Sequence, residues 1–329
     1  MIKKFGDASV FEIAEVPKPK AILGHVVIKV KATSVNPIDI KIRSGAVPAV
    51  APEFPAVLHG DVAGVVVEVG EGVTEFRVGD EVFGCAGGFK GTDGALAEYM
   101  LADVQLLAPK PKNLTMAQAA ALPLVTITAW ESLCNRAKVQ NGQTVLIHAA
   151  TGGVGHVAIQ LAKLAGAKVF TTASSEEKLS IGRRLGADET INYREQSVEQ
   201  YVKEYTDGKG FDIVFDTVGG ENLDRSFLAA ATSGTVLAIA ARSTHDLSPL
   251  HAKALSLHIT FMLLKVINKE QRQDHGRILR EVTNLVEKGK LHPLIDEKTF
   301  TFDQVSEAHS FLESNMAIGK VVLTNEWNY

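Results

Sequence analysis

The amino-acid sequence predicts an α/β protein that combines a doubly wound parallel sheet with a second domain built as a small β-barrel. Three observations carry this prediction. Beyond residue 140, short apolar runs alternate with stretches of helical spacing, which is typical of parallel strands covered by helices. Before residue 115, short strands are separated by glycine turns, as in a small barrel. Residues 145–172 read as strand, glycine turn, helix and second strand.

The first third of the chain has the patterns of β structure. Residues 25–31 alternate apolar and charged side chains, the mark of a half-buried strand. Residues 60–70 and 78–84 are predicted strands punctuated by glycine, and the same pattern continues over 94–100. Between the first two strands, residues 35–45 mix polar and apolar side chains around a proline, which predicts a loop and a short helix.

The hydrophobic period changes at Thr115, which is expected to cap a short helix ending near Leu122. A second helix is expected from Pro123 towards Arg136, with the proline in its tolerated first turn. Strands and helices then alternate. The predicted strands are 145–147, 168–172, 189–193, 211–217, 235–240 and, at the sheet edge, 258–264. The closing segment, with a helix over 272–288 and strands over 298–302 and 319–323, is too small for a domain and is expected to return to the first one.

Three glycines mark the turn between the first strand of the parallel sheet and its helix. Gly152, Gly153 and Gly155 follow the apolar run 145–147, although the first glycine of the usual G-x-G-x-x-G pattern is Ala150. An ordinary tight turn without a ligand is the alternative. Backbone without side chains can approach a pyrophosphate, which helix N-terminal N–H groups hold. The strand before, the helix and the second strand favour a dinucleotide site.

The end of the second strand indicates which dinucleotide binds. An NAD site places an acidic residue there to hold the ribose 2′-hydroxyl, but residues 172–175 read Thr-Ala-Ser-Ser. Ser174 offers a hydroxyl and Lys178 an ammonium, and both suit a 2′-phosphate. The alternative for Lys178 is a solvated helix residue. The absence of the acid favours NADP(H).

Composition bounds the partners and the compartment. A net charge of −4 and a pI near 6.2 give no general attraction to nucleic acid or to acidic membranes. The N-terminus lacks the apolar core of a secretory signal, and no apolar run is long enough to predict a membrane-spanning helix. Cys85 and Cys134 are the two cysteines, which predicts a reducing compartment without disulfides. We therefore expect a cytoplasmic protein.

Several sequence blocks occur in the order found in one known family. They are VNPIDIKIRSG (35–45), GDVAGVVVEVGEGV (60–73), VGDEVFG (78–84), ALPLVTITAW (121–130), AATGGVGHVAIQLAK (149–163), LGADETINY (185–193), FDIVFDTVGG (211–220) and AIGKVVL (317–323). With them the chain resembles the zinc-independent medium-chain dehydrogenases/reductases of the quinone oxidoreductase type, the group that includes zeta-crystallin. The resemblance implies a GroES-like β-barrel catalytic domain over 1–122, a Rossmann NADP-binding domain over 123–265, and a return to the catalytic domain over 266–329.

The resemblance also implies that the protein works without metal. Zinc alcohol dehydrogenases have a cysteine, a histidine and a second cysteine where this chain has Asn36, Gly60 and Leu124. Asn, Gly and Leu cannot make a site of thiolates and imidazole. His59 is one residue out of place and has no companion ligand, so a structural role is favoured for it.

The resemblance places cofactor contacts on particular residues. It implies that Gly152, Gly153 and Val154 hold the pyrophosphate, that Ser174, Lys178 and Tyr193 form the 2′-phosphate pocket, and that Ile239, Ala240, Leu263 and Leu264 line the nicotinamide.

The resemblance implies less about catalysis. Asn36 matches an asparagine near the nicotinamide and the substrate; alternatively it is a turn residue bonded to its own backbone. Asp39 and Arg43 could form an ion pair that supports this loop. Water or the hydroxyl of Thr126 could supply a proton.

The expected activity is NADPH-dependent transfer of hydride to a quinone or to the β-carbon of an enone, whose own oxygen takes up the negative charge. A short-chain dehydrogenase is the rival enzyme, since Tyr205 and Lys209 fit Y-x-x-x-K, but Asp207 and Gly208 would break the helix between them. An NADPH-binding protein with a structural or sensing role and little turnover is the alternative from another class. The resemblance implies a homodimer that pairs through the edge strand over 258–264.

Overall fold

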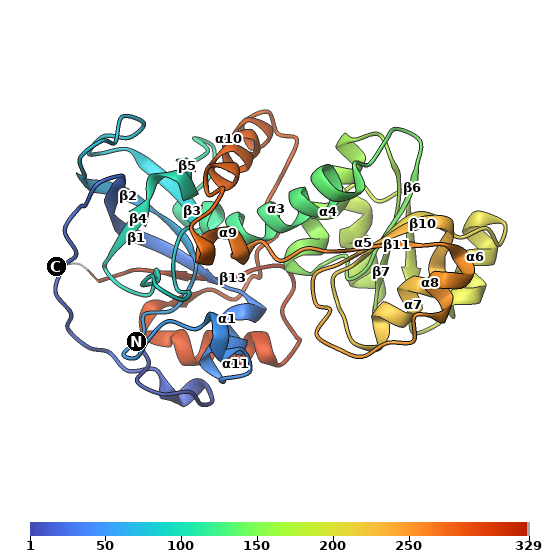
Figure 1. Ribbon diagram of the computed structural model, residues 1–329, viewed down its shortest axis with the longest axis horizontal. Helices are drawn as coiled ribbons and strands as arrows, with labels where there is room; N and C mark the ends of the chain where they lie inside the picture. Colours follow the sequence, from blue (N-terminus) through green and yellow to red (C-terminus); the bar gives the residue numbers. More distant parts are fainter. Residues whose placement is uncertain (328–329) are drawn as a thin grey trace. The chain divides into compact units, whose positions relative to one another are not determined.

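The computed structural model describes residues 1–327 and is drawn in Figure 1. The chain folds into two compact units. The barrel unit comprises Met1–Ile127 with Met262–Tyr329, and the Rossmann unit comprises Thr128–Phe261. The functional domain limits 1–122, 123–265 and 266–329 stay a prediction, and residues 328 and 329 lie outside the described part.

The barrel unit is built on a mostly antiparallel sheet of seven strands in the order β12-β13-β1-β2-β3-β5, with β4 paired to β1. The strands are β1 (His25–Val35), β2 (Asp61–Val69), β3 (Glu81–Cys85), β4 (Tyr99–Asp103), β5 (Leu107–Pro109), β12 (Phe300–Thr301) and β13 (Val321–Thr324). In the pairing of β13 with β1, Val321 lies opposite Val35. The end of the chain therefore returns to the sheet begun by its first third, as expected.

The helices of the barrel unit include α2, which begins directly after the predicted cap, Thr115. They are α1 (Pro37–Arg43), α2 (Met116–Ala120), α3 (Pro123–Trp130, which crosses into the Rossmann unit), α9 (Leu263–Asn268), α10 (Gln273–Glu287) and α11 (Val305–Glu313). The Thr115 side chain accepts from the N–H of Gln118, and the Gln118 side chain accepts from the N–H of Thr115, which closes a capping box at the start of α2. Helix α10 lies against β5 (Figure 1), where the Thr283 hydroxyl donates to the Pro109 carbonyl at 2.8 Å.

The Rossmann unit contains a six-stranded parallel sheet in the order β11-β10-β9-β6-β7-β8. The strands are β6 (Thr144–Ile147), β7 (Lys168–Ala173), β8 (Glu189–Asn192), β9 (Phe211–Asp216), β10 (Ala230–Ala238) and β11 (Ser256–Ile259). The helices between them are α4 (Gly153–Leu164), α5 (Glu176–Arg184), α6 (Val198–Thr206), α7 (Glu221–Ala229) and α8 (Ser248–Lys253). Phe170, Phe211 and Phe227 are fully buried in the core of this unit. The predicted doubly wound sheet is confirmed.

Three predicted elements differ from the structure. The strand over 258–264 ends at Ile259, and Leu263 begins α9, because a continuous apolar run does not separate strand from helix. Residues 94–96 do not form a strand: their N–H groups bond to the carbonyls of 57–59, so β4 begins only at Tyr99. The helix begun by Pro123 changes after Trp130 to a π-helix, Glu131–Ala137.

Candidate functional site

The glycine turn of the Rossmann unit has the geometry that a pyrophosphate site requires. Gly152 lies in the extended region as the N-cap of α4, so the first N–H groups of this helix have no intrahelical partner. A Cβ on Gly155 would lie 2.0 Å from the carbonyl oxygen of Ala149, and Ala149 itself has a φ of 60°. The turn is therefore folded tightly back on the strand, with a positive helix end left open for an anion.

Thr172, at the end of β7, supports this turn from the neighbouring strand. Its hydroxyl accepts from the N–H of Ala149 at 3.3 Å, and its carbonyl accepts from the N–H of Ala150 at 3.0 Å. The same hydroxyl lies 3.1 Å from Nδ1 of His148. Burial lowers the pKa of His148 to about 4, although nearby Asp216 opposes the shift, so this imidazole is neutral at neutral pH. His148 was not predicted from the sequence, although a histidine at the end of an apolar strand directly before the glycines could have indicated it.

The residues predicted for the 2′-phosphate lie where β7 and β8 end. Ser174 follows β7, and the N–H of Tyr193 donates to the carbonyl of Ala173 at 3.3 Å, which joins the two strand ends. Lys178 lies in the first turn of α5, whose cap is Ser175. The Lys178 ammonium has no hydrogen bond or ion pair within residues 1–327. The hydroxyl of Ser174 and the ammonium of Lys178 therefore lie near the end of β7, where residues 172–175 include no carboxylate.

The residues predicted to line the nicotinamide lie in both units. Ile239 and Ala240 directly follow β10, and the Ala240 carbonyl approaches Gly219 so closely that a Cβ there would lie at 2.1 Å. Leu263 and Leu264 open α9 and belong to the barrel unit, where Leu263 is buried and Leu264 is exposed. The close approach to Gly219 holds the end of β10 against the loop that follows β9.

In the barrel unit, Asn36 is buried and its polar groups are used by other residues. Its N–H donates to Asp39 at 2.7 Å, its Nδ2 donates to the Asp61 carboxylate at 2.8 Å, and its Oδ1 accepts from Lys320 Nζ. Asn36 is also the N-cap of α1, where it shares a capping box with Asp39, so both interpretations of this residue stay predictions. The amide orientation is fixed from both sides, and the bond to Asp61 uses one N–H of Nδ2.

Asp61 is the centre of this network. Its carboxylate also accepts from Ser34 Oγ at 2.7 Å and from the N–H of Leu124 at 2.8 Å. Lys320 Nζ lies 3.5 Å from it and donates to the Val35 carbonyl at 3.2 Å. Burial lowers the pKa of Lys320, while Asp61 and Asp39 oppose the shift. Asn36, Asp61 and Lys320, with Ser34, are named the Asp61 network below.

The Asp61 network includes one position to which the resemblance assigns a zinc ligand in zinc alcohol dehydrogenases, and it contacts a second. Asn36 and Leu124 stand at these two positions, Asp61 follows the third at Gly60, and Asp61 bonds to both. Asp61 and Lys320 were not predicted from the sequence, although a lysine between Gly319 and the apolar strand 321–324 could have indicated a buried charge. A buried ammonium thus supplies the positive charge at this place in the fold.

Two further expectations for the barrel unit meet different contacts. Arg43 forms its ion pair with Glu313 of α11, Nη2 to Oε1 at 2.6 Å, so the expected pairing with Asp39 is wrong. The reason is that Asp39 accepts from the N–H of Asn36 at the start of α1, while Arg43 lies at its end, next to α11. Thr126 is fully buried and its hydroxyl donates to the Leu122 carbonyl at 2.5 Å, so proton donation would require that bond to break.

His59 lies next to these positions but bonds to another histidine. Its Nε2 lies 2.8 Å from Nε2 of His309, and the two rings stack with centroids 5.1 Å apart. Burial lowers the pKa of both imidazoles, that of His309 to about 3. Within residues 1–327, no group of three or more His, Cys, Asp or Glu side chains is arranged to hold a metal ion.

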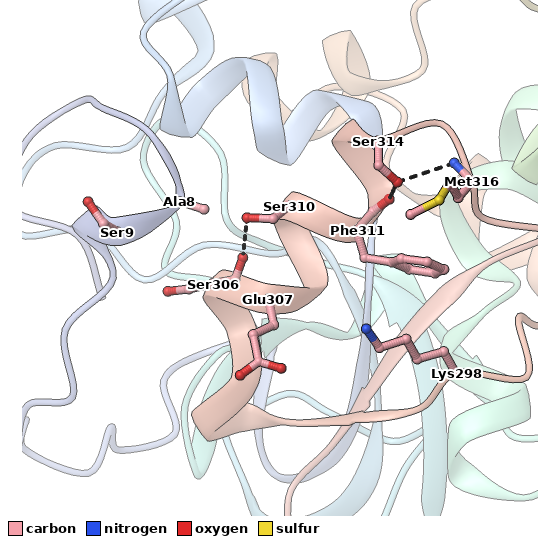
Figure 2. A pocket seen from close by; sticks show the side chains of 9 residues that line it. All are labelled: Ala8, Ser9, Lys298, Ser306, Glu307, Ser310, Phe311, Ser314 and Met316. Atoms are coloured by element: carbon pink, nitrogen blue, oxygen red, sulfur yellow. Dashed lines mark hydrogen bonds between the residues drawn. The ribbon is translucent and has the colours of Figure 1, made fainter.

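A surface groove of about 500 Å³ lies elsewhere in the barrel unit, along α11 (Figure 2). None of the site residues predicted from the sequence lines it. Its serines bond to nearby backbone: Ser310 Oγ donates to the Ser306 carbonyl at 2.9 Å, and Ser314 Oγ to the Phe311 carbonyl at 2.6 Å. Lys298 and Glu307 are the charged residues of its lining.

Comparison with known proteins agrees with this geometry. The family model for the alcohol dehydrogenase GroES-like domain matches residues 23–112, and a model described as zinc-binding dehydrogenase matches residues 185–323. The chain is 35% identical over 326 residues to the NADPH-dependent alkenal/one oxidoreductase of Arabidopsis thaliana, a chloroplastic protein, covering 97% of this chain and 77% of that one. It is 33% identical over 324 residues to human quinone oxidoreductase, covering 97% and 95%.

The chain belongs to the quinone oxidoreductase family of medium-chain dehydrogenases/reductases. Among solved structures, the quinone oxidoreductase of Escherichia coli, complexed with NADPH, superposes with a TM-score of 0.87 at 27% identity, covering 98% of each chain. The family assignment and the predicted fold class are therefore confirmed. Cys85 and Cys134 are both free thiols. None of the helices within the described residues has the length and apolar character needed to span a bilayer.

Proposed function

We propose that this chain is an NADPH-dependent oxidoreductase that reduces quinones or α,β-unsaturated carbonyl compounds without a metal. The observation that carries the proposal is the Asp61 network, in which a carboxylate and an ammonium bond to Asn36, a residue that the resemblance aligns with a zinc ligand of zinc enzymes. The names of the Arabidopsis and human relatives support the substrate class. The NADPH complex of the E. coli relative supports the cofactor.

The Rossmann unit has residues that fit two parts of the cofactor, the pyrophosphate and the 2′-phosphate. Gly152, Gly153 and Val154 form the open N-terminus of α4 and would hold the pyrophosphate. Ser174, Lys178 and Tyr193 would hold the 2′-phosphate, since residues 172–175 at the end of β7 lack the acid that an NAD site places there. When bound, NADPH supplies the hydride.

The substrate class follows from how the negative charge that forms on the acceptor during reduction can be stabilised. Reduction of a carbonyl compound leaves negative charge on oxygen, and a metal-free site offers no Lewis acid to hold it. A quinone or an enone spreads this charge through its own π system. We infer that the remaining N–H of Asn36 donates one hydrogen bond to that oxygen, with its amide fixed by Asp61 and Lys320.

We further propose a cytoplasmic homodimer. Strand β11 ends the parallel sheet, and Ile259 and Phe261 at its end are 47% and 41% exposed. An unpaired edge with exposed apolar side chains can pair with the same edge of a second copy across a twofold axis. Light scattering of the purified chain tests this, and a monomer at micromolar concentration would contradict it.

The test of the function follows the loss of NADPH absorbance with benzoquinone, phenanthrenequinone and a set of enones, compared with ethanol plus NADP in the reverse direction. We expect turnover of the conjugated acceptors and no comparable oxidation of ethanol. Zinc analysis and a chelator control accompany it. Tight NADPH binding without turnover of any acceptor would favour a binding or sensing role, and activity lost on zinc removal would overturn the metal-free mechanism.

A further inference from the structure

Three side chains of the Rossmann unit form a chain of hydrogen bonds that the cofactor site does not use. Ser243 Oγ lies 2.6 Å from Nε2 of His245, and Nδ1 of His245 lies 2.8 Å from a carboxylate oxygen of Asp224. The His245 side chain is 8% exposed, whereas Asp224 is 49% exposed and Ser243 is also exposed. The imidazole is therefore held between a carboxylate and a hydroxyl that reaches the surface.

This chain of hydrogen bonds lies at the carboxyl edge of the parallel sheet, where doubly wound folds bind their ligands. Ser243 and His245 lie in the loop that leaves β10, and Asp224 lies in α7, which follows β9. Ser243 stands three residues after Ala240, so its backbone is at most about 11 Å from that residue. If Ala240 lines the nicotinamide, the Ser243 hydroxyl is within reach of an acceptor bound against it.

The reduction consumes a proton as well as a hydride, and three other polar side chains described above are poor donors. The Thr126 hydroxyl donates to a backbone carbonyl. Lys320 places its ammonium on three acceptors, Val35, Asn36 and Asp61. The pKa of His148 is lowered by burial to about 4, so it carries no proton to give at neutral pH.

A simpler explanation is that the three residues only hold the loop after β10. Phe227 contacts the His245 ring edge-on with centroids 6.1 Å apart, which would serve that role. The order of the three groups, carboxylate, imidazole and hydroxyl, supports a role in proton transfer as well. A carboxylate on Nδ1 stabilises an imidazolium, and a hydroxyl on Nε2 can pass its proton on, which loop packing alone does not need.

We propose that Asp224, His245 and Ser243 form a proton relay that protonates the reduced acceptor; the proposal rests on the reductase function proposed above. Ser243 is the catalytic residue, while His245 and Asp224 act through it as positioning residues. The carboxylate of Asp224 orients the ring of His245 and stabilises its protonated form. The ring then returns a proton to the Ser243 oxygen after the hydroxyl has donated its own.

With an enone, the hydride forms a new C–H bond at the β-carbon, and the electron pair of the C=C bond moves onto the α-carbon and carbonyl oxygen. The Ser243 hydroxyl protonates this enolate. Ser243 Oγ then takes a proton from Nε2 of the His245 imidazolium, which leaves neutral imidazole still donating through Nδ1 to Asp224. Solvent returns the proton to His245, so one NADPH and one proton are consumed per saturated ketone formed.

The test compares His245→Gln and Ser243→Ala with Thr244→Ala, an exposed neighbour in the same loop. We expect kcat for enones to fall by about 100-fold or more in the first two variants, and the Kd for NADPH to stay within about twofold. The loss should be smaller for quinones, because a hydroquinone anion is a weaker base than an enolate. Proton transfer should become limiting, so the solvent isotope effect rises while the effect of 4-deuterated NADPH falls. Imidazole added to His245→Ala should restore part of kcat.

A second readout needs neither cofactor nor turnover. The proton between His245 Nδ1 and Asp224 should give a downfield NMR resonance in the free protein, lost in Asp224→Asn and kept in Thr244→Ala. The relay would be overturned if His245→Gln kept the wild-type kcat and both isotope effects. It would also be overturned if NADPH binding weakened in this variant by as large a factor as kcat falls. Wild-type protein that turns over no acceptor would instead refute the reductase function itself, so the two failures are distinguishable.

Discussion

The Asp61 network of the barrel unit and the carboxyl edge of the Rossmann unit use polar residues in opposite ways. In the first, Asn36, Asp61 and Lys320 are buried and bonded to one another. In the second, the open end of α4, Lys178 and Ser243 keep groups without a protein partner or at the surface. The difference teaches which region is fixed by folding and which is left for ligands: a satisfied buried network is rigid, and an unsatisfied edge can bind.

The largest effect should come from breaking the buried network at its cation. Lys320→Met leaves the Asp61 carboxylate buried without its ammonium, and loss of one partner of a buried pair costs about 3–5 kcal/mol of unfolding free energy. Urea unfolding measures it, with Lys290→Met at an exposed position as the control. The double variant Asp61→Asn, Lys320→Met should recover part of the loss. A loss as small as the control's would mean that Lys320 and Asp61 are both neutral in the folded protein.

The next effect tests whether the open edge really is a ligand site. Lys178→Ala removes one charge-assisted contact to the 2′-phosphate, worth about 1.5–3 kcal/mol. NADPH binding should therefore weaken by roughly ten- to a hundredfold, with NADH nearly unchanged and the unfolding free energy preserved. Titration calorimetry measures both cofactors, and Lys209→Ala on an exposed turn is the control. Equal weakening of NADH and NADPH would assign Lys178 to the fold.

The same difference between the two regions explains how much of each could be predicted from the sequence. The glycine turn was predictable because Gly152, Gly153 and Gly155 are close in sequence and a tight strand-to-helix turn demands them. The Asp61 network was not, because Asp61 and Lys320 are brought together by the pairing of β13 with β1, which local patterns do not specify. Register between chain ends is a tertiary property.

The same reason explains the smaller errors. Arg43 was expected to pair with the neighbouring Asp39, but α11, far along the chain, brings Glu313 to it. Residues 261–264 are all apolar and show no alternation, so the hydrophobic period could not reveal the change from β11 to α9 at the boundary between the two units. Local chemistry was predictable, and contacts across hundreds of residues were not.

A third prediction compares two glycines of the open edge. Gly155→Ala forces a Cβ to within 2.0 Å of the Ala149 carbonyl, whereas at Gly152 the same Cβ would lie 3.2 Å from that oxygen. The backbone must shift in the first variant, which should cost about 1–3 kcal/mol of unfolding free energy and weaken NADPH and NADH alike. Gly152→Ala should lose less stability. Thermal unfolding and calorimetry measure both, and equal losses would show that the turn is not tightly folded on the strand.

The smallest effect concerns Asp39, which lies beside the Asp61 network. Burial raises its pKa from the ordinary value of 3.8 to about 7, although the N–H of Asn36 opposes the shift. One of its oxygens, Oδ1, has no hydrogen-bond partner within residues 1–327. The folded state therefore holds a proton that the unfolded chain has already released above about pH 4.

Since the folded state binds more protons than the unfolded state between about pH 4 and pH 7, this group makes the free energy of unfolding fall as pH rises through that window. Asp39→Asn still offers an oxygen to the N–H of Asn36 and cannot titrate, so its unfolding free energy should decline less over the same window. Urea unfolding at a series of pH values measures the difference, with the exposed Asp207→Asn as the control. Parallel curves for wild type and Asp39→Asn would mean that Asp39 is already ionised in the fold, and the network beside it would then carry one more buried charge than its contacts satisfy.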